Sequence, residues 1–292
     1  MINIVFDPGA TGGPAKVVAN LLKGLQKIGY RKFELNAESS DAFDRVCVLS
    51  NAAWLAAHAQ DIDARFVLGP NLFVLPSDDA SGVVGRMAYR KYIQPSGWAL
   101  DVWRNWLPAE KLARWPVGID TEAFPQTRRR EKSVDLIVYI KRRPPELVAA
   151  VARVLAKQGR STKFIEYGHY SEDEFKNLLS CARAAVWVGA HESQGVAVQE
   201  CMSSGVPIFV LDVANTAEEF GKQPFGEYPA TTVPYWDGRC GERVASSILE
   251  EARLDDAFAD FWKRVEIGGY DPRSFVVENL GLERQAEAFL AL

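Results

Sequence analysis

Apolar and polar positions in the first third of the chain alternate in a way that predicts strands separated by helices and loops. Residues 2–6 are an apolar strand, and a glycine-rich loop follows them. In residues 17–29 the apolar side chains recur at the spacing that places them on one face of a helix. Pro14 suits the first turn of this helix, and Gly29 suits its end. Further strands are predicted at residues 45–50, 65–69 and 91–96.

A polar and basic stretch, residues 125–133, interrupts this pattern, and a second alternation of strands and helices follows it. The final segment, residues 274–292, has the pattern of one amphipathic helix. The second series predicts strands at residues 134–140, 162–168, 184–190, 206–213 and 230–236, and helices at residues 146–159, 172–184, 194–205 and 241–254.

Two series of alternating strands and helices predict an α/β protein with two doubly wound parallel sheets. We expect a first Rossmann-like domain at residues 1–124, a second at residues 125–270, and a C-terminal helix at residues 271–292 that packs back across the domains. A cleft between two such domains is the default place for a ligand.

Composition and charge narrow the classes of partner. The chain has 292 residues, a net charge of -4 and a pI near 5.6, so it has no overall attraction for nucleic acid. The N-terminus lacks the pattern of a signal peptide, and no apolar run approaches the ~20 residues that span a bilayer. The four cysteines are widely spaced and show no metal-binding pattern. These features predict a cytoplasmic enzyme or binding protein with reduced thiols.

Candidate chemistry gathers after the apolar run at residues 184–190. In an open parallel sheet, ligands bind beyond the carboxyl ends of the strands, where helix N-termini present unpaired amides. A helix that begins near Gln194 or Gly195 would offer the amides of Gly195, Val196 and Ala197 to an anion. Carboxylates on either side of an anion would repel it. We therefore expect Glu192 and Glu200 to accept hydrogen bonds from sugar hydroxyls.

The spacing of these two glutamates, E-x7-E, followed by Gly205-Val206-Pro207, resembles the signature of family-4-type retaining glycosyltransferases of the GT-B fold. Residues 115–124 (WPVGIDTEAF) resemble the interdomain phrase of that family, with Pro116-Val117-Gly118 where proline and asparagine-glycine are usual. The resemblance covers roughly residues 3–250 and implies a GT-B fold. It also implies that Glu192 contacts the donor sugar and Glu200 the ribose of the nucleotide.

The same resemblance assigns the remaining donor-binding residues. It places Gly12 and Gly13 near the donor phosphates, and Gly168 and His169 against the nucleotide base. His191, Ser193, Gln194 and Val196 would line the same site. The family uses an arginine and a lysine beyond the strand at residues 134–140. Here Lys141, Arg142 and Arg143 are adjacent, and we predict that Lys141 and Arg142 bind the diphosphate because alternate side chains of an extended stretch diverge.

These residues predict transfer of a sugar from a nucleotide-diphosphate sugar to an acceptor hydroxyl, with retention of configuration. Lys141, Arg142 and Glu192 are the expected catalytic residues, and neither a metal nor a cofactor is expected. The expected acceptor is a glycan or lipid-linked molecule in polysaccharide or glycoconjugate biosynthesis. The family often has a histidine near the donor sugar in the first domain, whereas this chain has only His58, in a helical stretch.

Two alternatives to this prediction remain open. The missing first-domain histidine and the short first domain are also consistent with a non-catalytic nucleotide-sugar or glycan-binding protein, and the fold also serves nucleotide-sugar epimerases. A segment rich in tryptophan, arginine and lysine, residues 89–116, has two interpretations. One is a core with snorkelling basic side chains. The other is peripheral docking of the first domain on the inner face of a membrane.

Overall fold

The computed structural model describes residues 1–39, 42–79, 81–128, 131–221, 226–246 and 251–292. The chain divides into two compact units: the first comprises Met1–Gly118 with Leu280–Leu292, and the second comprises Ile119–Asn279. Each unit contains one parallel sheet, as the alternating pattern predicts. No helix among the described residues is long and apolar enough to cross a membrane.

In the described part of the first unit, six parallel strands lie in the order β2-β1-β3-β4-β5-β6. Two of these strands, β2 and β6, were not predicted: each has three residues, as β4 does, but unlike β4 they are partly exposed and have no continuous apolar run. The elements are β1 (Ile2–Val5), α1 (Gly12–Lys27), β2 (Phe33–Leu35), β3 (Arg45–Val48), α2 (Ala52–Ala57), β4 (Phe66–Leu68), α3 (Val83–Arg86), β5 (Lys91–Gln94), α4 (Gly97–Trp103), β6 (Leu112–Arg114) and α10 (Leu282–Ala291).

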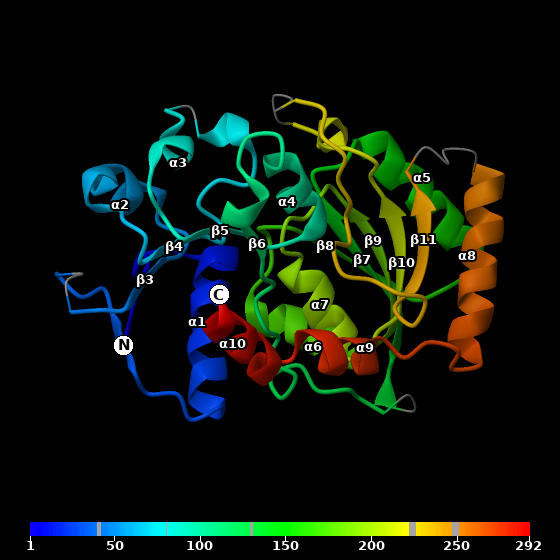
Figure 1. Cartoon of the computed structure of the whole chain (residues 1–292). Coiled ribbons are helices and arrows are strands. Elements are labelled where there is room, and N and C mark those ends of the chain that lie inside the picture. Colours follow the sequence, from blue (N-terminus) through cyan, green and yellow to red (C-terminus); the bar gives the residue numbers. More distant parts are fainter. Residues whose placement is uncertain (40–41, 80, 129–130, 222–225, 247–250) are drawn as a thin grey trace. The chain divides into compact units, whose positions relative to one another are not determined.

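The C-terminal segment forms two helices where one was predicted. The break lies at Gly281, whose extended backbone precedes α10. Helix α10 then packs against α1 of the first unit, and Figure 1 shows the two side by side. A Cβ atom on Gly24 would lie 2.6 Å from the carbonyl oxygen of Leu282, so glycine permits this close approach. The expected segment 271–292 is therefore shared between the two units.

In the described part of the second unit, five parallel strands lie in the order β11-β10-β9-β7-β8. The inner strands β7 and β9 are almost continuously apolar because helices cover both faces of the sheet. The elements are β7 (Val134–Lys141), α5 (Pro145–Lys157), β8 (Thr162–Glu166), α6 (Glu172–Cys181), β9 (Ala182–Gly189), α7 (Val196–Ser203), β10 (Ile208–Asp212), β11 (Gly241–Ala245), α8 (Glu251–Glu266) and α9 (Pro272–Leu280).

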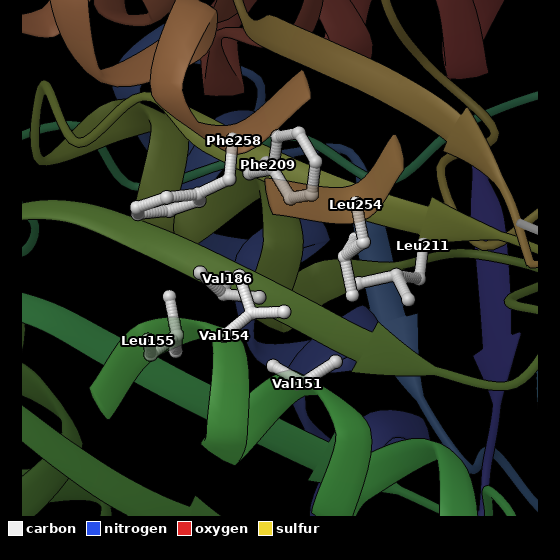
Figure 2. A pocket seen from close by; sticks show the side chains of 8 residues that line it. All are labelled: Val151, Val154, Leu155, Val186, Phe209, Leu211, Leu254 and Phe258. Carbon is white, nitrogen blue, oxygen red and sulfur yellow. The ribbon is translucent and has the colours of Figure 1, made fainter. Parts of the chain in front are cut away.

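The core of the second unit lies between one face of its sheet and the helices α5 and α8. Phe209 of β10 packs against Phe258 and Phe261 of α8 within this layer. Figure 2 shows a small gap in the same layer, lined only by aliphatic and aromatic side chains from α5, β9, β10 and α8. Because no polar group lines this gap to orient a ligand, it is packing space within the core.

The predictions for residues 230–236 and 241–254 were wrong in part. Residues 230–236 were predicted as a strand, but they form irregular backbone. The last strand is instead Gly241–Ala245, which lies within the segment predicted as a helix, and α8 begins at Glu251. Gly241 has a φ of +139°, and a Cβ atom there would lie 2.0 Å from the carbonyl oxygen of Ile208. Only glycine can start the strand so close to β10.

The junction between the two units falls after Gly118, six residues before the expected boundary at 124. Residues 119–124 belong to the second unit because they are bonded to it. Ser203 Oγ donates to the carbonyl oxygen of Phe124 at 2.9 Å, and the Arg273 guanidinium donates to the same oxygen at 3.0 Å. Lys132, a little further on, donates to the carbonyl oxygen of Gly205 at 3.4 Å. These contacts hold the connecting segment on the end of α7.

Replacement of Gly241 by alanine should lower the free energy of unfolding by about 1–3 kcal/mol, because the new Cβ atom would collide with the Ile208 carbonyl group in a strained backbone conformation. Gly238→Ala is the matched control, since a Cβ atom there has open space around it. Urea denaturation of both variants measures the difference. Equal stability of the two variants would contradict the described start of β11.

Lys132 supplies a prediction for pH. Burial lowers the pKa of its ammonium group from 10.5 to about 8. Below about pH 8 the ammonium group of Lys132 is protonated in both the folded and the unfolded state. The folded state then carries a buried charge, and the free energy of unfolding is lowered by the full cost of that burial. Between about pH 8 and 10.5 only the unfolded state keeps the proton, and the destabilisation disappears. Lys132→Met should therefore raise the free energy of unfolding by about 2–3 kcal/mol near pH 7 and by little at pH 10.5. Chemical denaturation at several pH values measures this difference. A gain in the free energy of unfolding that stays constant from pH 7 to pH 10.5 would contradict the lowered pKa of Lys132.

Candidate functional site

The candidate site lies at the carboxyl edge of the second sheet, between β7 and β9. These neighbouring strands pair in register, with Lys141 at the end of β7 opposite Gly189 at the end of β9. After β7 the chain passes through α5 to β8 on one side, whereas after β9 it passes through α7 to β10 on the other. The two connections therefore leave the sheet in opposite directions, so β7 and β9 form a topological switch point. In such sheets, ligands bind beyond the carboxyl ends of the strands at this point.

Lys141 and Glu192 meet directly at this edge. Lys141 Nζ lies 2.7 Å from Glu192 Oε1, and both side chains are largely buried, with exposed fractions of 13% and 15%. The ring of Tyr167, just after β8, lies 4.4 Å from Lys141 Nζ and provides a cation–π contact. The backbone also joins the two loops, because the amide of Ala190 donates to the carbonyl oxygen of Lys141 at 2.9 Å.

Arg142 turns out of the strand direction and pairs with a glutamate that was not among the predicted site residues. Its φ of +51° lies in the left-handed region, which a non-glycine residue rarely adopts. Arg142 Nη1 lies 2.7 Å from Glu219 Oε1, and His191 Nε2 lies 3.6 Å from Glu219 Oε2. The amide of Phe220 donates to the Arg142 carbonyl oxygen at 2.9 Å. Glu219 therefore links the loops that follow β7, β9 and β10.

Arg143 is buried, with an exposed fraction of 6%, although a basic turn after a strand is usually solvated. One guanidinium nitrogen lies 3.6 Å from Glu218 Oε2. Burial lowers the pKa of Arg143, and the carboxylates of Glu218 and Asp212 offset this only in part. Glu218 in turn accepts from the amide of Ala214 at 2.6 Å. Arg143 thus fastens the loop after β10 to the sheet edge.

Helix α7 begins at Val196, one residue after the latest predicted start. Its N-cap residue is Gly195, whose φ of +69° is left-handed and which has no side chain to accept from the first-turn amides. Gly195 also packs closely on Pro234. Gln194 is buried just before the helix, and its carbonyl oxygen accepts from Gln199 Nε2 at 2.5 Å, while Ser193 is half-buried. The N-cap residue of α7 therefore supplies no side-chain acceptor to the amides of the first turn.

Glu200 lies one turn into α7 and is buried, with an exposed fraction of 3%. The hydroxyl of Tyr170, between β8 and α6, donates to that of Tyr139 in β7 at 3.2 Å. Burial raises the pKa of Tyr170, and the carboxylates of Glu200 and Glu192 raise it further. Both glutamates of the E-x7-E motif therefore act electrostatically on Tyr170.

The other predicted donor-binding residues occupy less enclosed positions. Gly168 is in a left-handed turn after β8, with a φ of +86°. The exposed ring of His169 has Nδ1 3.4 Å from Glu166 Oε2. Gly12 and Gly13 belong to the first unit, where they open α1 and where Gly12 has a φ of +64°. The loop at Gly12 and Gly13 lies beyond the carboxyl end of β1, at the corresponding edge of the first sheet.

Sequence reasoning missed Tyr167, Glu219 and Asp212. Asp212 is the last residue of β10, and an acidic residue at the carboxyl end of an apolar strand is a signal that could have been used. Glu219 has no such signal, because it reaches the site through an irregular loop. Among the described residues, no cluster of three or more histidine, cysteine, aspartate or glutamate side chains is arranged to hold a metal.

This arrangement combines two kinds of chemistry in one place. Cationic side chains and the amides of a helix start that has no side-chain cap are suited to a phosphate or diphosphate group. Largely buried carboxylates beside them are suited to hydroxyl donors, because an ionised carboxylate only accepts hydrogen bonds. A molecule with a diphosphate between two polyhydroxyl groups has both features.

No protein-family model matches the sequence, and none of the curated proteins compared with it does. Solved structures do match. Sucrose-phosphate synthase from Thermosynechococcus elongatus has a TM-score of 0.68 at 12% identity, over 99% of this chain and 97% of that one. The lipopolysaccharide outer core galactosyltransferase WaaB has a TM-score of 0.57 at 13% identity, over 100% and 99%. UDP-GlcNAc 2-epimerase from Neisseria meningitidis, bound to UDP-GlcNAc, has a TM-score of 0.53 at 13% identity, over 99% and 98%.

These similarities confirm the predicted fold class: the chain has a GT-B-like fold, with two parallel sheets and helices at its C-terminus. At 12–13% identity they concern the fold alone. Enzymes of different kinds share this fold: a sucrose-phosphate synthase, a galactosyltransferase and an epimerase. The choice of reaction therefore rests on the residues at the site.

Proposed function

We propose that this protein is a retaining glycosyltransferase that moves a sugar from a nucleotide-diphosphate sugar to an acceptor hydroxyl. The observation that carries the proposal is the Lys141–Glu192 pair, which lies between β7 and β9 and a few residues before the start of α7, a helix whose N-cap has no side-chain acceptor. A cation, a set of amides and a carboxylate within one small edge fit the phosphate and hydroxyl groups of such a donor.

In this proposal the diphosphate lies at the start of α7. Negative charge builds on the departing diphosphate as the glycosidic bond stretches, and the ammonium group of Lys141 and the amides of the first turn stabilise it. Arg142 adds a second cation from the same loop. A preorganised donor of this kind contributes about 3 kcal/mol to the transition state. These groups perform the stabilisation without requiring a metal.

The two glutamates take the hydroxyl groups at the ends of the donor. Glu192 accepts from the transferred sugar and Glu200 from the ribose, while Gly168 and His169 approach the base. His191, Ser193, Gln194 and Val196 line the space between them. The acceptor hydroxyl attacks the anomeric carbon on the same face from which the diphosphate leaves, so the configuration is retained. As the new glycosidic bond forms and the bond to the diphosphate breaks, an oxygen of the departing diphosphate takes the acceptor proton. The acceptor is a glycan or lipid-linked hydroxyl in polysaccharide or glycoconjugate biosynthesis.

Lys141→Met should lower turnover about a hundredfold and weaken donor binding much less, because its cation acts mainly on charge that develops in the transition state. Release of nucleoside diphosphate from UDP-glucose, GDP-mannose and ADP-glucose measures turnover, and calorimetry measures binding. Lys176→Met is the matched control, since it removes a Lys–Glu pair on the surface of α6, where Lys176 Nζ lies 3.2 Å from Glu172 Oε1.

Three outcomes would contradict parts of this proposal. Full turnover by Lys141→Met would exclude Lys141 from the diphosphate site. Tight binding of one nucleotide sugar by the unmodified protein, with no release even with acceptors present, would favour a non-catalytic binding protein. Inversion of a sugar carbon without any acceptor would favour an epimerase on the same fold.

A further inference from the structure

Asp212, at the carboxyl end of β10, is the centre of a hydrogen-bond network behind the candidate site. Its side chain is about nine-tenths buried, with an exposed fraction of 10%. The hydroxyl group of Thr231 donates to both carboxylate oxygens, at 2.8 and 3.0 Å, and the amide of Thr232 donates at 2.7 Å. Arg243 Nε lies 3.1 Å from the same carboxylate. The ionised acceptor makes these bonds stronger than those between neutral groups.

Thr231 and Thr232 transmit this restraint to the loop that carries Glu192. The amide of Glu192 donates to the Thr231 carbonyl oxygen at 3.0 Å. The Thr232 hydroxyl donates to the carbonyl oxygen of Gly189, at the end of β9, at 3.3 Å. Asp212 therefore fixes the backbone on both sides of the short turn between Gly189 and Glu192, without touching that turn itself.

We propose that Asp212 is a positioning residue that sets the place of Glu192 through Thr231, and so governs how strongly the sugar of the donor is recognised. This inference rests on the proposed function of Glu192. Lys141 also holds the Glu192 carboxylate, but a diphosphate competes for that ammonium group. When the diphosphate is bound, the Asp212–Thr231–Glu192 connection still fixes the backbone of Glu192.

The chain contains a closely similar network at the opposite edge of the same sheet. Asp135, near the start of β7, accepts from the amide and the hydroxyl group of Ser161, both at 3.0 Å, and lies 3.0 Å from Arg183 Nη1. Loss of this carboxylate should affect stability in a similar way, but it lies at the amino edge, away from Glu192. Asp135→Asn is thus a matched control for Asp212→Asn.

The test compares UDP, GDP and ADP with UDP-glucose, GDP-mannose and ADP-glucose by calorimetry. The measured quantity is the affinity for a nucleotide sugar divided by the affinity for its nucleoside diphosphate, called here the sugar gain. In Asp212→Asn and in Thr231→Val, this gain should fall about tenfold, while affinity for the nucleoside diphosphate changes less than twofold. Thr231→Ser keeps the hydroxyl group and should restore the gain. Asp135→Asn should keep it as well. An unchanged gain in both Asp212→Asn and Thr231→Val would overturn the inference.

Amide hydrogen exchange separates this inference from the proposed function. Exchange at residues 190–195 without any ligand should quicken about tenfold in Asp212→Asn and Thr231→Val, but not in Asp135→Asn. Unchanged exchange would overturn the inference even if the protein transfers sugar. Failure of the unmodified protein to bind any of the nucleotide sugars, with exchange quickened as expected, would instead overturn the proposed function and, with it, the role in sugar recognition.

Discussion

The pairing of Lys141 with Glu192 is the interaction around which the candidate site is organised. Both side chains are mostly removed from water, and a charge in such a place destabilises the fold unless an opposite charge lies beside it. The pair exists because β7 and β9 are neighbours whose connections leave in opposite directions. A one-residue change of register between these strands would shift Lys141, at the end of β7, away from the loop after β9 that carries Glu192, and would separate the two charges.

The other cationic side chains at this edge are also paired with opposite charges. Both described arginines that directly follow β7 have an acidic partner. Arg142 is paired with Glu219 and Arg143 with Glu218, and both glutamates come from the loop after β10. Ion pairs of this kind stabilise a protein little when they are exposed. Here at least one partner of each pair is largely buried, and backbone hydrogen bonds join the same loops, so the main effect of the pairs is to fix the loops. A fixed set of dipoles and charges is what a site needs to stabilise a transition state without reorganising.

The sequence was informative where the relevant signals are local. The apolar runs of β7 and β9, the break at Gly195 and the glutamate spacing around α7 all lie within short stretches, and the structure assembles them at one edge. Prediction from the sequence failed where the deciding contact joins residues that are far apart in the chain. Residues 230–236 look like a strand but are irregular, because Thr231 and Thr232 bond to Asp212, some twenty residues earlier. Residues 241–254 contain helix-forming residues, yet pairing with β10 makes 241–245 a strand.

The close pairing of Lys141 with Glu192 also bears on how a donor would bind. An ammonium group that turns toward a diphosphate weakens its hold on the carboxylate, which is then available to the hydroxyl groups of a sugar. The two halves of the proposed donor are therefore coupled through one ion pair: phosphate binding frees the acceptor that the sugar uses, and a hydroxyl group on that acceptor frees the cation. Such coupling is reciprocal by thermodynamic necessity. A nucleotide or a sugar alone would have to break the pair without the compensation that the intact donor brings.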